Sequence, residues 1–145
     1  MNLFIKFFNS PFKEKTILFE TLLYLFYTRL LLLLPFRWIA PGLGKHMVET
    51  PYDIPNEYIT AIRSVRQAVN RLSNRTPWKS TCLVQAITGK KMLKRRGILT
   101  TLYLGVAKEK DNNNKMKAHA WLRCGKIILT GREGHKQFTI VSLFG

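Results

Sequence analysis

The spacing of apolar residues divides the chain into a helical first part and a strand-rich second part. After Asn56, apolar residues recur every three or four positions with arginines between them, which predicts an amphipathic helix that ends at residues 72–74. A second helix is expected to begin at Ser80 or Thr81, because either hydroxyl can cap the free backbone amides of a first turn. Gly97 follows the last helically spaced apolar residue and is expected to end this helix.

Beyond Gly97 the pattern changes to an alternation of inward and outward positions, which is typical of strands. Four strands are expected, at residues 98–107, 117–124, 126–130 and 138–142. The polar run at 109–115 is expected to turn the chain between the first two strands, and Gly125 between the next two. Because the helices precede the strands, the sequence predicts an α+β fold in which helices are followed by an antiparallel sheet.

The most apolar segment runs from Thr16 to Ala40 and raises the question of a membrane span. Glu20, Arg29 and Pro35 interrupt this segment. Even residues 21–34, which include Arg29, would extend only about 21 Å as a helix, whereas the hydrocarbon core of a bilayer is roughly 30 Å thick. Burying Arg29 in lipid would also cost about 2.5 to 3.5 kcal/mol. We therefore expect a helix over residues 14–34, ended by Pro35, that packs on the domain, on a partner or on a membrane surface.

The segment that follows this helix is rich in residues that interrupt regular structure. Residues 35–55 contain prolines at 35, 41, 51 and 55 and glycines at 42 and 44, so we expect a loop that links the apolar helix to the more regular part of the chain. The predicted organisation is therefore an apolar helical segment with its linker at residues 1–56 and a compact core at 57–145.

Composition adds a strong positive charge to this picture. Lysine and arginine number 24 against 8 acidic residues, which gives a formal net charge of +16 over 145 residues. Such a surface attracts anions, so a non-enzymatic basic module that binds nucleic acid or an anionic membrane is one interpretation. The cations are spread from Lys6 to Lys136 instead of forming one stripe, and charge alone therefore selects no partner.

The two cysteines, Cys82 and Cys124, form neither a CxxC pair nor a zinc-finger spacing, which fits a reducing compartment. A disulfide between them, or a mixed zinc site with His119 and His135, is conceivable but disfavoured. We expect neither a metal nor a cofactor.

Cys82 lies at the expected start of the second helix, where unpaired amides and the positive end of the helix dipole favour a thiolate. His119 lies on the second expected strand and is the candidate general base. Among the acids only Glu133 follows His119, which makes it the candidate third member that orients the imidazole. A backbone carbonyl or the Gln137 amide is the alternative for that role.

Stabilisation of an oxyanion requires hydrogen-bond donors beside the nucleophile. The backbone amide of Cys82 is the first candidate donor, and the indole of Trp78 is the second, with packing as the alternative function of that ring. Trp121, two residues after His119, is expected to shield the imidazole from water.

Four segments now carry a resemblance to a known family: W-K-S-T-C-L-V-Q-A at 78–86, K-R-R-G at 94–97, L-x-L-G-V at 102–106 and A-H-A-W-L at 118–122. Together they resemble the transglutaminase-like, papain-related core of the leader peptidases of lasso peptide biosynthesis, the B-type maturation proteins. The resemblance covers roughly residues 57–145, and the apolar amino-terminal helix is weakly similar as well.

The resemblance implies a cysteine peptidase that cleaves between leader and core of a ribosomally made precursor, before a separate ATP-dependent cyclase forms the macrolactam. The family's nucleophile and histidine carry over to Cys82 and His119. Its aspartate does not, because the corresponding positions read Thr130, Gly131 and Arg132, which leaves Glu133 as the substitute.

The same resemblance suggests partners and a location. Single-chain members carry a leader-recognition domain, for which this chain has no room, so a separate recognition protein is expected to deliver the precursor, and the cyclase is a further expected partner. A cytoplasmic enzyme is implied, with membrane-surface contact left open and no role for nucleic acid. Transfer of the acyl group to an amine, as in crosslinking transglutaminases, is the alternative reaction.

Overall fold

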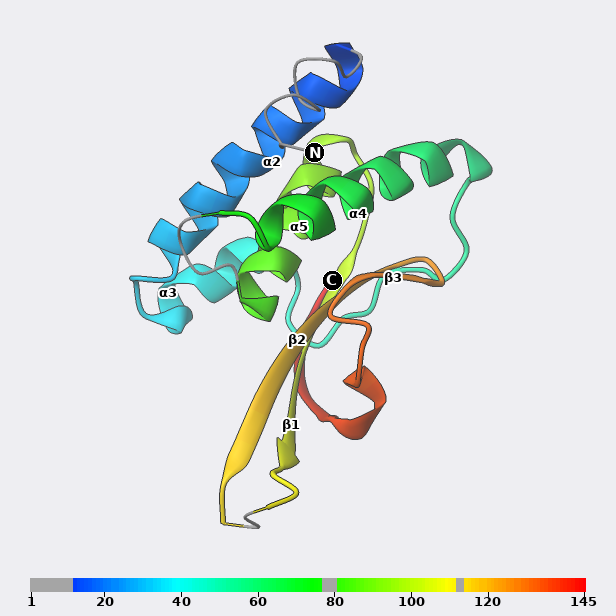
Figure 1. The fold of residues 1–145 in the computed structure, drawn as a ribbon. Helices are drawn as coiled ribbons and strands as arrows, with labels where there is room; N and C mark the ends of the chain where they lie inside the picture. Colours follow the sequence, from blue (N-terminus) through cyan, green and yellow to red (C-terminus); the bar gives the residue numbers. More distant parts are fainter. Residues whose placement is uncertain (1–11, 77–80, 112–113) are drawn as a thin grey trace.

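The fold was described from a computed structural model, which describes residues 12–76, 81–111 and 114–145. Helices occupy the first part of the chain and strands the second (Figure 1). The helices are α2 (Phe12–Leu31), α3 (Phe36–Ile39), α4 (Ile59–Ser73) and α5 (Cys82–Arg95), with short 3₁₀ turns η1 (Ala40–Leu43), η2 (Asn56–Tyr58) and η3 (His135–Gln137). The strands are β1 (Thr101–Lys108), β2 (Met116–Cys124), β3 (Ile127–Thr130) and β4 (Thr139–Phe144).

The four strands form one antiparallel sheet in the order β3-β2-β1-β4. Beyond β4, the linker runs along the outer edge of the sheet, where the Lys45 amide donates to the Gly145 carbonyl at 2.7 Å and the Met47 amide to the Leu143 carbonyl at 2.7 Å. This pairing covers an edge that would otherwise expose free backbone groups. The predicted α+β fold with an antiparallel sheet is confirmed.

The core lies between the helices and one face of the sheet. Because strand side chains alternate, Ala120, Leu122 and Cys124 of β2 face the helices and join the main buried cluster. Their neighbours His119, Trp121 and Arg123 fall on the opposite face, where Trp121 packs with Tyr103 in a smaller buried cluster. The sheet is therefore buried on both faces over most of β2.

The two helices predicted after Asn56 are confirmed, whereas the helix expected over residues 14–34 spans Phe12–Leu31 and so ends before Pro35. The inner face of α4 is buried at Ile62, Val65, Ala68, Val69 and Leu72. Helix α5 begins at Cys82 with Thr81 as its cap, since the Thr81 hydroxyl accepts a hydrogen bond from the Val84 amide at 3.4 Å. Gly97, at φ +74°, ends the helix in the left-handed conformation that glycine adopts most easily.

Two expectations need correction. The segment expected to be a loop contains α3 and η1, because Pro35 and Pro41 stand at helix starts, where a missing amide costs nothing. The first strand begins at Thr101 and not at residue 98, and the Thr100 carbonyl instead accepts a hydrogen bond from Lys90 Nζ at 2.7 Å. Part of the expected turn, residues 112–113, lies outside the described residues, and the boundary between residues 56 and 57 stays a prediction.

Helix α2 packs against α4 and α5 on one side only (Figure 1). Its inner face includes polar side chains: Glu20, Thr21 and Thr28 are buried. The Thr28 hydroxyl accepts a hydrogen bond from the Thr88 hydroxyl of α5 at 3.2 Å, and the Thr21 hydroxyl donates to the Ile17 carbonyl at 2.6 Å. In the described part of the chain, no helix is long and apolar enough to span a bilayer.

Glu20 holds α2 against the end of α5. Its carboxylate accepts two hydrogen bonds from Arg96, at 2.8 and 2.6 Å, and Arg95 lies 3.2 Å away. The hydrogen bond from Arg96 lowers the pKa of Glu20 below its ordinary value, although burial acts in the opposite direction. The ion pair is thus a specific anchor between the first helix and the core.

Replacing Glu20 with glutamine is expected to lower the free energy of unfolding by about 2 kcal/mol at neutral pH, because Arg96 loses its charged partner. The folded pKa lies below the unfolded value near 4.5, so the stabilisation is complete above that pH and is lost as pH falls through the folded pKa. Urea denaturation of both proteins across acidic pH measures this. If the difference in unfolding free energy between the two proteins stayed constant into strong acid, the ion pair of Glu20 with Arg96 would not be its cause.

Candidate active site

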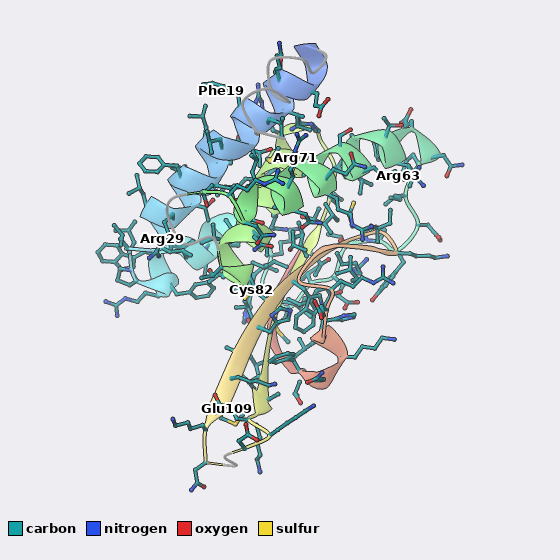
Figure 2. The ribbon with its side chains drawn as sticks, viewed as in Figure 1. Phe19, Arg29, Arg63, Arg71, Cys82 and Glu109 are labelled. Carbon is teal, nitrogen blue, oxygen red and sulfur yellow. The ribbon has the colours of Figure 1, made fainter. Side chains whose placement is uncertain are left out.

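Cys82 is the first residue of α5, and its side chain is partly buried where this helix meets the sheet (Figure 2). The position follows from the local sequence, because Thr81 caps the helix and fixes Cys82 in the first turn. Helix amides without intrahelical partners lie in this turn and direct a positive partial charge towards the sulfur. The structure therefore agrees with the helix-start position expected for Cys82.

His119 lies in the middle of β2, paired with Gly105 of β1. Its half-buried ring stacks against Trp121, with ring centres 5.8 Å apart, and contacts Phe138 at 5.0 Å. These two aromatic rings restrict the orientation of the imidazole and reduce its contact with water, as expected for Trp121. Sequence reasoning did not identify Phe138, since it was assigned only to a strand.

A backbone carbonyl fixes the tautomer of His119. Nε2 of the imidazole lies 2.7 Å from the carbonyl oxygen of Gly131, just after β3. A carbonyl oxygen only accepts hydrogen bonds, so Nε2 must carry the proton and Nδ1 of the neutral ring holds the lone pair. The Gly131 carbonyl is therefore placed to orient the imidazole, which is what the third member of the predicted triad would do.

Residue 131 lies so close to β2 that only glycine fits at this position. Its φ is +68°, and a Cβ added there would overlap the Ala120 carbonyl oxygen and lie 3.1 Å from Nε2 of His119. Any larger residue would therefore have to move the carbonyl that holds the imidazole. The sequence indicated this position only as the place where an expected aspartate is missing.

Replacing Gly131 with alanine is expected to reduce kcat by roughly 100-fold, because a small displacement of a catalytic group has an effect of that order. Gly134→Ala is the matched control: its φ is +72°, but an added Cβ would meet only the Gln137 amide, at 3.5 Å. The comparison is made from pH profiles of kcat/KM. If both variants lost the same amount of activity, backbone strain, and not displacement of the carbonyl that contacts His119, would explain the loss in Gly131→Ala.

The proposed catalytic residues line one open cavity of about 510 Å³. Its walls come from α4, α5, β2, β3 and the segment after β3, with the polar members Arg66, Asn70, Cys82, Gln85, His119, Arg132 and Glu133. Arg66 and Asn70 also line an adjoining groove of about 620 Å³ along α4, the helix on which Figure 2 labels Arg63 and Arg71. The reactive groups thus face a polar, accessible space with arginines on its walls.

The cavity brings three of the predicted site residues together. Glu133 is exposed at its wall, whereas the hydrogen bond described for the His119 ring goes to Gly131, so a direct orienting role of Glu133 stays a prediction. Gln137 lies in η3 after Gly134. Trp78, the predicted second oxyanion donor, lies outside the described residues.

The second cysteine has a different environment. Cys124 is fully buried, its thiol donates to the Leu99 carbonyl at 3.4 Å, and burial raises the pKa of this thiol to about 11. A thiol of this kind is a poor nucleophile near neutral pH. Both cysteines are free, and the described residues contain no group of three His, Cys, Asp or Glu side chains that could hold a metal ion.

The arrangement offers a helix-start thiol, a histidine with a defined tautomer and an accessible polar cavity, which suits nucleophilic acyl chemistry. The family model of the transglutaminase-like superfamily matches residues 30–143, a range that contains Cys82, His119 and Gly131. No curated protein gives a significant match. No solved structure gives a significant match either.

Proposed function

Because this chain belongs to the transglutaminase-like superfamily, whose enzymes typically act through a catalytic cysteine, we propose that it is a cysteine peptidase that removes the leader from a lasso peptide precursor. The observation that carries the proposal is the shared cavity of Cys82 and His119, together with the Gly131 carbonyl that keeps a proton on Nε2 of the histidine. The lasso peptide substrate rests on the combined motifs at 78–86 and 118–122.

In the first half-reaction, Nδ1 of His119 takes the proton of the Cys82 thiol, and the thiolate attacks the carbonyl carbon of the scissile peptide bond. The carbonyl oxygen becomes an oxyanion, for which the amide of Cys82 is the first donor and Trp78 the predicted second. The C–N bond then breaks, and His119 returns its proton to the departing amine. The products are a thioester between the leader and Cys82 and a core peptide with a free amino group.

Hydrolysis of the thioester completes the cycle. His119 takes a proton from water, the resulting hydroxide attacks the thioester carbonyl, and the C–S bond breaks as the sulfur recovers its proton. The positive charge that forms on the imidazole in each half-reaction lies next to the Gly131 oxygen, whose partial negative charge stabilises it. The leader leaves as a carboxylate.

Two partner proteins belong to the proposal. A separate recognition protein delivers the leader, and a cyclase uses the newly formed amino group of the core peptide. The arginines Arg66, Arg132 and Arg63 on the walls of the cavity and of the adjoining groove offer positive charge to an acidic peptide or partner, whereas Arg71 is already paired with Glu14 at 2.9 Å.

The test is incubation of the full chain with the precursor peptide encoded beside it and its recognition protein, under reducing conditions, followed by mass spectrometry. We expect two fragments that add up to the precursor plus one water. A folded wild type that leaves the precursor intact would overturn the proposal and favour the basic binding module.

Acyl transfer is the second candidate, because members of the superfamily act as peptidases or acyltransferases and use the same nucleophile. Repeating the digestion with an added primary amine separates the two reactions. A leader that carries the amine in place of a free carboxylate would identify transfer, whereas the free carboxylate identifies hydrolysis.

A further inference from the structure

The outward face of α2 is exposed to solvent but is as apolar as a buried surface. From Phe19 to Leu30, every exposed side chain of this helix is apolar or aromatic: Phe19, Leu22, Leu23, Phe26, Tyr27 and Leu30. Of the polar residues of the same stretch, Glu20, Thr21 and Thr28 are buried and Arg29 is half-buried. Figure 2 shows Phe19 on the side of α2 that faces away from α4 and α5. An aqueous surface helix normally has the reverse arrangement.

Exposed apolar residues also follow the helix along the chain, and we call these residues and the outward face of α2 together the outer face. It includes Leu33, Leu34, Phe36 and Trp38, of which Trp38 is 63% exposed. So many exposed large apolar side chains on neighbouring turns of the chain indicate a binding surface, because water-exposed proteins seldom carry them together. Aromatic residues such as Trp38 and Tyr27 suit the boundary between water and lipid.

Cations border the outer face. Lys91, Lys94 and Arg95 of α5 line a groove together with Phe19, Leu23 and Tyr27 of α2, and the ammonium of Lys91 lies 5.6 Å from the centre of the Tyr27 ring. Arg29 lies in the last turn of α2 and Arg37 is exposed between Phe36 and Trp38. Glu20, the acid in this groove, is already neutralised by Arg95 and Arg96.

We propose that the outer face docks in the plane of an anionic lipid bilayer, with α2 lying along the surface and the bordering cations on the headgroups. Exposed apolar residues on one helix face with cations beside them are the arrangement of interfacial helices.

Two other occupants are less well supported. A second copy of the chain would bring two molecules of charge +16 together and align like charges around the contact. A protein partner would be expected to meet a surface that mixes apolar and polar groups, because interfaces between separately folded proteins are only slightly more apolar than other surfaces. The outer face between Phe19 and Leu30 contains no exposed polar side chain apart from the hydroxyl of Tyr27.

The experiment is co-sedimentation of the full chain with vesicles of phosphatidylcholine mixed with phosphatidylglycerol, compared with vesicles of phosphatidylcholine alone. The wild type is expected to pellet with the mixed vesicles at physiological salt, and to release partly as salt is raised. Replacing Phe19, Leu23 and Phe26 with serine is expected to weaken partitioning by at least about 30-fold, since each loses buried apolar area. Replacing Lys94 and Arg37 with glutamine is expected to weaken it by about 10-fold or more.

The matched control is a pair of equally exposed apolar residues on the sheet: Met116 is 57% and Val141 55% exposed, against 60% for Phe19. Met116→Ser and Val141→Ser should bind vesicles like the wild type. Circular dichroism and urea denaturation show whether the α2 variants are folded, so the test does not depend on peptidase activity.

Three results would overturn membrane docking. The first is a monomeric wild type that stays in the supernatant with mixed vesicles, which would leave a different protein as the remaining occupant of the outer face. The second is equal binding of the serine variant and the wild type. The third is a wild-type dimer that the serine variant converts to a monomer while neither protein binds lipid, which would assign the face to a second copy.

Discussion

Replacing Cys82 with alanine is expected to abolish cleavage of the precursor, with a loss in kcat of at least about 1000-fold, because the reaction then has no sulfur to form the thioester. His119→Ala should cause a loss of similar size, since nucleophile and base act as one unit and their effects are not additive. Single-turnover digestion followed by mass spectrometry measures both. Unfolding free energies close to that of the wild type would exclude a structural explanation.

The second cysteine supplies the control for this result. Cys124→Ala should retain cleavage, because the Cys124 thiol is buried and its pKa is raised to about 11. Brief treatment of the wild type with iodoacetamide should place one alkyl group on Cys82 and none on Cys124. Alkylation of Cys124 would contradict its burial, whereas cleavage that survives in the Cys82→Ala variant would remove Cys82 from the mechanism.

Arg123→Met is expected to have the largest effect on stability, a loss of about 3 to 5 kcal/mol in the free energy of unfolding. Arg123 is only 4% exposed, and its guanidinium donates to the Thr50 carbonyl at 2.8 Å, the Gly125 carbonyl at 2.7 Å and the Tyr103 hydroxyl at 2.8 Å. Methionine fills much of the volume but leaves these acceptors unpaired in the interior.

The charge of Arg123 is balanced through a relay. The Tyr103 hydroxyl, which accepts from Arg123 Nε, donates in turn to the Glu49 carboxylate at 2.8 Å. Burial raises the pKa of Tyr103 well above its ordinary value, so the phenol stays protonated and the relay stays intact. The network therefore fastens the linker at residues 49–50 to the sheet.

Urea denaturation of Arg123→Met, beside Arg63→Met as a control, measures the effect. Arg63 is exposed on α4, so its replacement should change the free energy of unfolding by no more than about 0.5 kcal/mol. Losses of similar size in the two variants would show that the buried network contributes little.

The helices and the fold class could be predicted from the sequence because their signals are local. The period of Ile62, Val65 and Val69 specifies which face of α4 is buried, and Thr81 and Gly97 mark the ends of α5 within a few residues of the backbone groups they serve. The position of Cys82 at a helix start follows from the same local chemistry. The ends of the strands were less well predicted. The Thr100 carbonyl, for example, accepts a hydrogen bond from the Lys90 side chain, and β1 begins only after it.

Other features depend on groups that meet only when the chain has folded. The acceptor for His119 is a main-chain oxygen 12 residues away. Every residue carries such a carbonyl oxygen, so side-chain types could not reveal that Gly131 provides it. Arg123 looks like a surface residue in the sequence, and only the register of β2 and the path of the linker enclose it. The spacing of apolar residues along α2 likewise did not predict which face of this helix packs against α4 and α5.

The sequence by itself determined the α+β fold class, the helix that presents Cys82 and the strand that carries His119, because periodicity, capping and turn residues act over a few neighbours along the chain. Only the tertiary structure decided that these two residues share a cavity, that a carbonyl at Gly131 holds the histidine, and that α2 buries polar side chains. These outcomes depend on contacts between segments far apart in sequence, where the energy comes from packing and from pairing of buried polar groups.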